Sequence, residues 1–335
     1  MTTPDDNMRQ LFDQLEELVK KHERILLTSH ARADGDGLGS MLGLLHHLRD
    51  RDKKIVCFAK DFTPGPYHFM PGVDEVTSNI ETVHDHQPQL VILLDSANIE
   101  RTHIIDHLKS RSRDSYQVVN IDHHPADPND ADEQKNIDLQ IVDHGMSSTA
   151  EIVFHYFDHH NHNISRPTAT CLLTGILTDT GNFSNKATTD SSMSAAGSLL
   201  ISGANLQQIT EKTIRNKSVG SLKLWGRALS RLIHDPKTGI VSTAILQQDL
   251  ADYNVNEEAA DGIANFLNNL DGAKAVIIFR EETAGVVRGS LRTTRDDVDV
   301  AKLAAQYGGG GHTKAAGFTT NGKLIPDKTG WRIEH

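Results

Sequence analysis

The chain has 335 residues and a formal net charge of −11, from 34 Lys and Arg against 45 Asp and Glu. That length predicts roughly two domains, and the acidic balance argues against a broad basic surface for a long nucleic-acid polymer. No apolar run is long enough to span a membrane, and the acidic N-terminus lacks the pattern of a secretory signal. Two cysteines, Cys57 and Cys171, fit a reducing compartment, so we expect a cytoplasmic protein.

Helical patterns and short apolar runs alternate along the first half of the chain. Apolar residues at helical spacing open it and predict an amphipathic helix. Four runs rich in β-formers then predict buried strands at residues 25–29, 55–59, 90–94 and 116–121. A glycine-rich turn at 34–39 leads from the first of them into a helix. This alternation predicts an α/β lobe with a mainly parallel, doubly wound sheet, up to about residue 185.

The second half of the chain predicts a helical connector and a smaller α/β lobe. The pattern from about residue 188 to 233 is helical and polar. Beyond it, strands are predicted at 239–246, 273–280 and 286–292, with helices at 257–270 and 299–307. We therefore expect two α/β lobes joined by an ordered helical segment.

Carboxylates and imidazoles follow three of the four strands predicted in the first lobe. They are His30, Asp34 and Asp36 after the first strand, Asp95 after the third, and the triplet Asp122-His123-His124 at the end of the fourth. Another acid, Asp179, lies near the end of a helical run. Because ligands bind at the carboxyl ends of the strands in open α/β sheets, we expect these side chains to meet.

The combination of these groups predicts a metal site. One acid after a strand is usually a turn or helix-cap residue, and one His-His pair is a weak signal among 19 histidines. Several carboxylates in a partly buried cleft, however, repel one another unless cations neutralise them. Gly35 and Gly37 are expected to let the backbone turn Asp34 and Asp36 toward one point. Mixed imidazole and carboxylate ligands suit Mn²⁺, so we predict two Mn²⁺ ions, with Mg²⁺ or Co²⁺ as substitutes.

Two patterns in the second lobe predict anion binding. Arg288, Ser290 and Arg292 alternate along a strand and would share one face, where arginines recognise phosphate. A solvated strand face is the alternative. The second pattern is the segment Gly308-Gly309-Gly310-Gly311-His312. Its unhindered backbone N–H groups could cradle an anion, although four glycines also fit a flexible loop.

In this order the motifs resemble the DHH phosphoesterases that carry a DHH-associated type 1 domain. The resemblance rests on residues 30–40, Asp95, the Asp122-His123-His124 triplet, residues 175–183 and the terminal GGGGH-x-x-AAG, and it spans nearly the whole chain. One departure is Ala33, where the family usually has proline. Within the family the layout is most similar to a bacterial group that degrades very short RNA and dephosphorylates 3′-phosphoadenosine 5′-phosphate.

The resemblance implies a role for each position. His30 and Asp34 would bind one Mn²⁺, the residues Asp36, His123 and Asp179 would bind the other, and Asp95 would bridge both. Asp122 would orient its neighbours, and His124 would contact the scissile phosphate. The other end of the substrate would be held by Arg288, Ser290, Arg292, Gly309, Gly310, Gly311 and His312. Residues 1–190 would then be catalytic, residues 191–235 the connector and residues 236–335 substrate-binding.

The implied activity is hydrolysis of short RNA and nucleotide bisphosphates by a hydroxide that two metal ions activate. Long polymers and membranes are not expected partners, and the oligomeric state is left open, a homodimer included. One rival is a phosphodiesterase for cyclic or linear dinucleotides, which would use the same two lobes. Another is a nucleotide- or RNA-binding module without catalysis, which would leave the carboxylates unexplained. The remaining histidines, His46-His47 and His159-His160 included, are interpreted as surface or packing residues.

Overall fold

The computed structural model describes residues 4–124, 136–213, 217–260, 262–268, 270–282 and 285–334. The chain forms two compact units, Met1–Asn216 and Lys217–His335. A parallel sheet in the first unit and a smaller α/β second unit confirm the predicted fold class. Within the described ranges, no helix combines the length and the apolar character that a membrane crossing requires.

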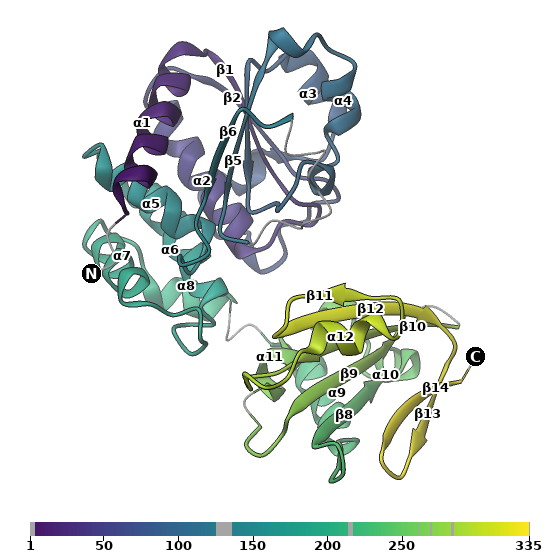
Figure 1. Ribbon diagram of the computed structural model, residues 1–335. Helices are drawn as coiled ribbons and strands as arrows, with labels where there is room; N and C mark the ends of the chain where they lie inside the picture. Colours follow the sequence, from purple (N-terminus) through teal and green to yellow (C-terminus); the bar gives the residue numbers. More distant parts are fainter. Residues whose placement is uncertain are drawn as a thin grey trace. The chain divides into compact units, whose positions relative to one another are not determined.

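A six-stranded sheet forms the centre of the first unit (Figure 1). Its order is β3-β2-β1-β4-β5-β6, and all neighbours are parallel. The strands are β1 (Arg24–Ser29), β2 (Lys54–Phe58), β3 (Val76–Thr77), β4 (Leu90–Leu94), β5 (Gln117–Asp122) and β6 (Leu139–Val142). The edge strands β3 and β6 add to the four predicted ones, because two and four residues carry too little pattern to be recognised.

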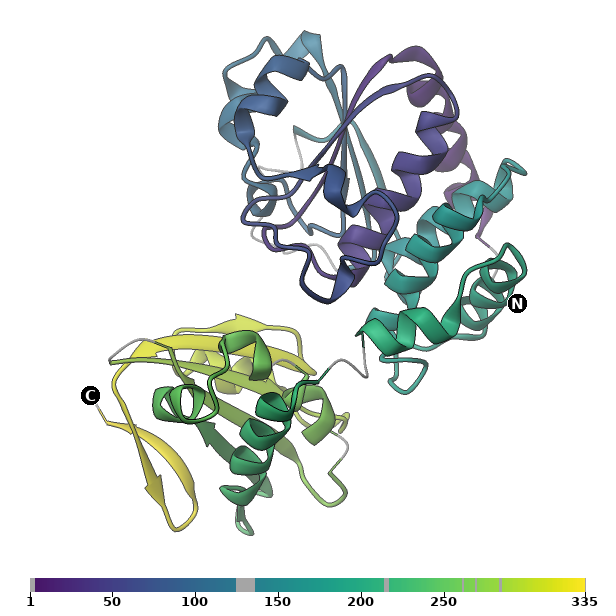
Figure 2. The same ribbon diagram turned by 180° about the vertical axis from the view of Figure 1, so that it is seen from behind.

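Helices cover both faces of this sheet (Figures 1 and 2). One face packs against α1 (Asp6–Lys21), α2 (Gly35–Arg49), α5 (Thr149–His159) and α6 (Arg166–Asp179), the other against α3 (Ile80–His86) and α4 (Ile105–Lys109). Short 3₁₀ turns are η1 (Gly65–Tyr67), η2 (Val73–Glu75), η3 (Glu100–Thr102) and η4 (Arg113–Ser115). Successive strand residues alternate between the two cores: Leu27 faces α2, whereas Leu26 faces α3 and α4. Burial on both faces explains why the strands are continuous apolar runs.

The segment expected as a connector, residues 191–235, is divided between the two units. It contains nearly all of α7 (Asp190–Ile201), then α8 (Leu206–Thr213), α9 (Val219–Ser230) and β7 (Ile233–Asp235). The units divide after residue 216, so α7 and α8 belong to the first unit and α9 to the second. The assignment of separate roles to the three segments stays a prediction.

The sheet of the second unit is mixed, with the order β11-β12-β10-β9-β8-β7. Among its described strands only β8 and β9 pair in parallel. The remaining strands are β8 (Ile240–Ile245), β9 (Ala275–Glu281), β10 (Val286–Arg292), β11 (Gly310–Gly311) and β12 (Ala315–Asn321). A separate hairpin consists of β13 (Lys323–Asp327) and β14 (Gly330–Glu334). The strands after residue 309 were not predicted, because glycines, alanines and polar residues hide their alternation.

Helices also cover both faces of the second sheet (Figures 1 and 2). One face packs against α9, α10 (Gln247–Asp252), the 3₁₀ turn η7 (Glu257–Ala260) and α11 (Ile263–Leu267), the other against α12 (Val300–Ala305). The helix predicted at 257–270 is interrupted, because Gly262 adopts the left-handed conformation with φ 86°. On β10, Val287 and Leu291 pack toward α12. The alternate residues of β10 therefore face α11.

Candidate active site

The carboxyl ends of three parallel strands bring functional side chains to one edge of the first sheet. His30 follows β1 directly, Asp95 follows β4, and β5 ends at Asp122. Ser29 and Leu94 are register partners, so β1 and β4 end side by side. The strand order reverses between these two strands, and such a switch point is where open α/β sheets bind ligands.

The first turn of α2 positions two carboxylates. Asp34 is the N-cap, and its Oδ1 accepts the N–H groups of Asp36 and Gly37 at 3.0 and 3.3 Å. Asp36 is fully buried, and its two oxygens accept the N–H groups of Thr149 and Ala150 at 2.7 and 2.9 Å. These donors belong to the first turn of α5, where the helix dipole favours negative charge. The N-terminus of α5 therefore holds the Asp36 carboxylate in place.

Close contact between α2 and α6 brings Asp179 to the site. A Cβ on Gly39 would lie 2.6 Å from the carbonyl oxygen of Cys171, and one on Gly175 would lie 2.8 Å from Asp36 Oδ1. Only glycine allows the helices this separation. Asp179 is the last residue of α6, so the approach of the two helices places its carboxylate beside the start of α2.

Gly35 and Gly37 also allow close packing, Gly35 against α6 and Gly37 against β1. The expectation that they relax a turn is wrong, since both lie within α2 and neither has a positive φ. A Cβ on Gly35 would lie 2.4 Å from Thr178 Oγ1, and one on Gly37 would lie 2.2 Å from Ser29 Oγ. Their role is steric, and it could not be read from the sequence because the neighbouring atoms come from distant segments.

At this edge of the first sheet, three sets of side chains gather potential ligand atoms within 4.8 Å of one another. They are His30, Asp34 and Asp95; Asp36, His123 and Asp179; and Asp95, His123 and His124. The first two sets are the ones expected to hold two metal ions. The carboxylate of Asp95 lies between them: its Oδ2 is 3.9 Å from His30 Nε2, and its Oδ1 is 3.7 Å from His123 Nε2. This arrangement fits a bridging ligand.

The donor atoms fit divalent transition-metal ions. His123 Nε2 is buried, has no hydrogen-bond partner among the described residues, and lies 3.1 Å from Asp179 Oδ2. The ring of His30 donates from Nδ1 to the carbonyl oxygen of Ala31 at 2.9 Å, which leaves the lone pair of Nε2, 3.9 Å from Asp34 Oδ1, available to a metal ion. A second ring nitrogen anchored on a carbonyl is typical of metal-bound histidines. Imidazole nitrogens mixed with carboxylate oxygens suit Mn²⁺ and similar ions.

The electrostatics of the cluster also favour a cation. Burial, together with the charges of Asp95 and Asp179, raises the pKa of Asp36 well above its ordinary value. Burial raises the pKa of Asp95 to about 6. Carboxylates held together away from water oppose one another's ionisation. Divalent cations would remove this penalty, so the cluster is suited to be occupied by metal.

Asp122 positions His124. Its Oδ1 accepts the backbone N–H and the ring Nδ1–H of His124 at 2.8 and 2.9 Å, and its Oδ2 accepts the N–H of Ala97. Asp95 Oδ1 lies 3.2 Å from the same ring nitrogen. Burial opposes a charge on His124, but hydrogen bonds to Asp122 and Asp95 outweigh it and raise the pKa of His124 to about 11. The two carboxylates therefore favour the charged form of the His124 ring.

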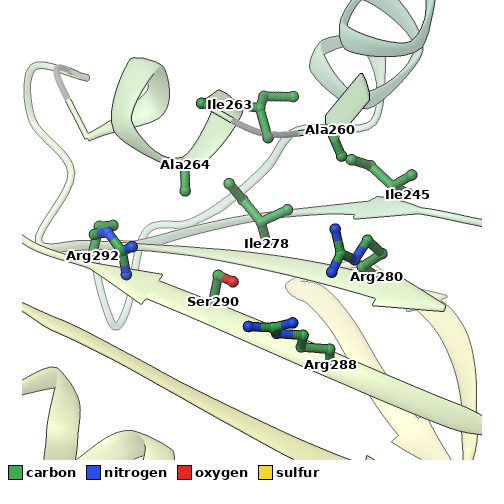
Figure 3. Close-up of a pocket in the computed structure, with 10 residues that line it drawn as sticks. Ile245, Ala260, Ile263, Ala264, Ile278, Arg280, Arg288, Ser290 and Arg292 are labelled. Carbon is green, nitrogen blue, oxygen red and sulfur yellow. The ribbon is translucent and has the colours of Figure 1, made fainter. Parts of the chain in front are cut away.

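A pocket of about 250 Å³ lies in the second unit, between α11 and the sheet (Figure 3). Arg288, Ser290 and Arg292 point into it from β10, as their alternation predicts. Ile263 and Ile278 are among the apolar side chains that line it. Guanidinium groups combined with an apolar wall can accommodate both a phosphate and a less polar part of a ligand.

Arg280 is a third arginine in this pocket and was not among the expected residues. It is the register partner of Arg288 across β9 and β10, and cross-strand partners share a face. Glu282 Oε1 lies 3.5 Å from Arg280 Nη2 and 3.6 Å from Arg288 Nη1. Burial lowers the pKa of Arg292, and no carboxylate among the described side chains pairs with it. The only signal for Arg280 was its place on a predicted strand, and the pairing register cannot be read from one strand.

The glycine-rich segment at 308–312 uses several of its backbone donors internally. The N–H groups of Gly308 and Gly309 donate to carbonyls at the end of α12 at 3.1 and 3.0 Å, and that of His312 donates to Ala315 at 2.8 Å. The expectation of an open cradle is therefore wrong for these three donors. Gly309 also has a steric role, because a Cβ there would lie 2.2 Å from the carbonyl oxygen of Gly317.

The glycine-rich segment at 308–312 contains β11, which lies two strands away from β10, the strand that carries two of the pocket arginines. Gly310 is the register partner of Gly317, which in turn is paired with Ser290. Adjacent strands are about 4.8 Å apart, so β11 lies roughly 10 Å from β10 across the sheet. Gly310, Gly311 and His312 are exposed. Substrate binding by these residues stays a prediction.

A phosphoester hydrolase needs groups that bind metal ions and groups that bind phosphate. The first unit has potential metal ligands at the switch point of its sheet, and the second unit has an arginine-lined pocket. Comparison with protein families specifies the class: residues 24–176 match the DHH family, N-terminal domain, and residues 238–328 match the DHHA1 domain. The chain therefore belongs to the DHH phosphoesterase family, as its motifs predict, and is a hydrolase of phosphoester bonds.

Relatives with named activities match most of the chain. It is 30% identical over 298 residues to the bifunctional oligoribonuclease and PAP phosphatase NrnA of Thermus thermophilus, with 89% of this chain and 84% of the relative covered. It is 25% identical over 344 residues to the cyclic-di-AMP phosphodiesterase PdeA of Listeria monocytogenes, covering 92% of this chain but 46% of the relative.

A solved structure shares the fold. The crystal structure of an exopolyphosphatase-related protein from Bacteroides fragilis superposes with a TM-score of 0.83 and 24% sequence identity. The match covers 92% of this chain and 91% of that chain. Both units therefore have counterparts in a single solved chain.

Proposed function

We propose that this chain is a Mn²⁺-dependent phosphoesterase that hydrolyses RNA pieces of a few nucleotides to mononucleotides and converts 3′-phosphoadenosine 5′-phosphate to AMP. The observation that carries the proposal is the position of Asp95, with one oxygen toward His30 and the other toward His123. The activity in the name of the Thermus thermophilus relative supports this choice of substrates. A cytoplasmic location belongs to the same proposal.

Six side chains would hold two Mn²⁺ ions: His30, Asp34, Asp36, Asp95, His123 and Asp179. When bound, such a pair of ions lowers the pKa of a water and stabilises charge on the phosphoryl oxygens. The ring of His124 would donate to a phosphoryl oxygen of the substrate as negative charge develops there. Asp122 would keep the His124 ring oriented through its hydrogen bond to Nδ1.

The second unit would bind the part of the substrate that does not react. Three arginines in its pocket, Arg280, Arg288 and Arg292, can neutralise only a few phosphates. With a net charge of −11, the chain has little means to hold a long polymer electrostatically. Short oligonucleotides and nucleotide bisphosphates therefore suit it better than long RNA.

A substrate panel tests this function. With Mn²⁺ we expect rapid hydrolysis of 5′-labelled di- to pentanucleotides and of 3′-phosphoadenosine 5′-phosphate, slow hydrolysis of a 24-mer, and none after chelation by EDTA. Product analysis by gel and chromatography gives the rates. Equal rates on a trinucleotide and the 24-mer would contradict the preference for short substrates, and full activity in EDTA would contradict the metal requirement.

A dinucleotide phosphodiesterase is the second candidate, and the name of the Listeria monocytogenes relative favours it. Cyclic di-AMP, the linear dinucleotide pApA and 3′-phosphoadenosine 5′-phosphate should be compared in one assay. Our proposal expects the bisphosphate and linear oligonucleotides to be hydrolysed faster than the cyclic dinucleotide. A clear preference for cyclic di-AMP would replace it with this alternative.

Replacing Arg292 with methionine tests the pocket. A charge-assisted hydrogen bond contributes about 1.5–3 kcal/mol, so we expect kcat/KM for 3′-phosphoadenosine 5′-phosphate to fall about 10- to 100-fold, mainly through a higher KM. Arg295→Met is the matched control, because Arg295 is exposed, pairs with Asp297 and does not line the pocket. Equal KM values for the two variants would show that the pocket does not bind substrate.

A further inference from the structure

A cluster of histidines lies at the C-terminal end of α5, away from the candidate active site. Its members are His47, His159, His160 and His162, with ring centroids 4.4 Å apart for His47–His162, 4.6 Å for His159–His160 and 5.4 Å for His160–His162. The N-terminus of α5 holds Asp36, and the helix is 11 residues long. At 1.5 Å per residue the cluster is about 16 Å from that end. It is therefore separate from the phosphoesterase site.

Two of these rings and a carboxylate of α1 converge on one point. Asp13 Oδ1 lies 2.9 Å from His159 Nε2 and 3.8 Å from His160 Nε2, and the three atoms are all within 4.8 Å of one another. In a tetrahedral zinc site, bonds of about 2.0–2.2 Å place neighbouring ligand atoms roughly 3.3 Å apart. The observed distances fall on either side of this value. Small side-chain adjustments would therefore complete the geometry.

Packing holds both rings in this orientation. The ring of His159 lies 6.0 Å from that of Phe12, and the ring of His160 lies 5.3 Å from that of Tyr156, edge to face. His160 Nε2 is 3.3 Å from the carbonyl oxygen of Phe12, and a metal ion would replace this contact. The Asp13 side chain is 60% exposed, so an ion can enter and water can supply a fourth ligand.

The neighbouring acid on α1 is already neutralised. Glu16 accepts hydrogen bonds from Arg51 at 2.9 and 2.6 Å and from the hydroxyl of Tyr156 at 2.6 Å. His162 Nε2 lies 3.4 Å from the same carboxylate. Asp13, by contrast, interacts only with the two histidines among the described residues. It is therefore the carboxylate available to a cation.

We propose that Asp13, His159 and His160 form a third metal site, which takes Zn²⁺ with water as the fourth ligand and fastens α1 to α5. Two imidazoles and one carboxylate are a common zinc donor set, and late first-row ions bind such sites more tightly than Mn²⁺ does. The site is independent of phosphoester hydrolysis, because none of its residues belongs to the metal-ligand sets around Asp95.

Zinc stoichiometry tests the proposal. The full chain and its variants are dialysed against micromolar Zn²⁺, and the bound metal per chain is measured by elemental analysis. Wild-type protein should retain one zinc ion more than Asp13→Asn and more than His159→Gln/His160→Gln. The control His68→Gln/His234→Gln, which removes two exposed imidazoles elsewhere, should match the wild type. The difference in zinc content between the wild type and the site variants does not depend on how many ions the catalytic site holds. The result of this test is therefore independent of the proposed function.

Thermal unfolding supplies a second readout. Added Zn²⁺ should raise the Tm of the wild type and of the control more than that of either site variant, since an ion that binds only the folded state stabilises it. Mn²⁺-dependent hydrolysis should be the same in all four proteins. Because Asp13 is exposed, Asp13→Asn will fold even where the double variant does not. Wild-type zinc content in Asp13→Asn would overturn the proposal.

Discussion

Asp95→Asn is expected to lower kcat/KM for a trinucleotide by about 10³-fold or more. The amide keeps the volume of the side chain but loses the charge that lies between His30 of one proposed ligand set and His123 of the other. Two-metal sites contribute several kcal/mol of transition-state stabilisation, and a loss of about 4 kcal/mol is three powers of ten in rate. Steady-state kinetics with Mn²⁺ measures the effect, and elemental analysis should show less bound Mn²⁺ than in the wild type.

The matched control for Asp95→Asn is Asp74→Asn, which removes an exposed carboxylate from the same unit. It should retain wild-type kinetics and wild-type Mn²⁺ content. If Asp95→Asn also kept near-native turnover, Asp95 would not be a shared ligand, and the two-metal assignment would have to be abandoned.

Gly39→Ala is expected to damage both stability and activity. Its Cβ would lie 2.6 Å from the carbonyl oxygen of Cys171 and 2.9 Å from the backbone nitrogen of Gly175, and neither backbone atom can swing away. Overpacking of this kind costs about 1–3 kcal/mol. The helices must separate, which moves Asp36 away from Asp179. A displacement near 1 Å at a catalytic centre can cost about 10²-fold in rate.

Denaturant unfolding and steady-state kinetics measure the two effects of Gly39→Ala. Gly197→Ala on α7 is the control, because a Cβ there meets no atom within 4 Å. Alanine has the higher helix propensity by up to about 1 kcal/mol, so this variant should be as stable as the wild type or more stable. Wild-type stability and activity in Gly39→Ala would show that α2 and α6 tolerate a wider separation than the structure indicates.

Patterns within single segments were sufficient to predict much of the fold of the first unit. The strands β1, β4 and β5 were predicted because burial on both faces makes each a continuous apolar run. His30 and Asp95 were predicted to share a site because parallel strands end at the same edge of a sheet. In the second unit, Arg288 and Arg292 were predicted to share a face because side chains alternate along a strand.

Features that depend on contacts between segments far apart in the sequence were either not predicted or predicted with the wrong physical cause. Arg280 joins the pocket only through its pairing with Arg288. Gly35 and Gly37 were expected to let the backbone turn two carboxylates toward one point, whereas they fit against other segments of the chain. The interpretation of His159 and His160 as surface or packing residues agrees with their partial exposure and ring contacts, but their approach to Asp13 was not predicted, because it depends on how α5 packs against α1.

The sequence by itself determined the fold class, the family, and the order of the acids and histidines along the chain, because local burial and strand endings leave patterns in it. Only the tertiary structure decided that Asp95 turns one oxygen toward each ligand set, from a left-handed backbone with φ 55°. It also decided that facing glycines let α2 and α6 bring Asp36 and Asp179 together. Distances of this kind arise from contacts between segments far apart in the chain, and no pattern within one segment encodes them.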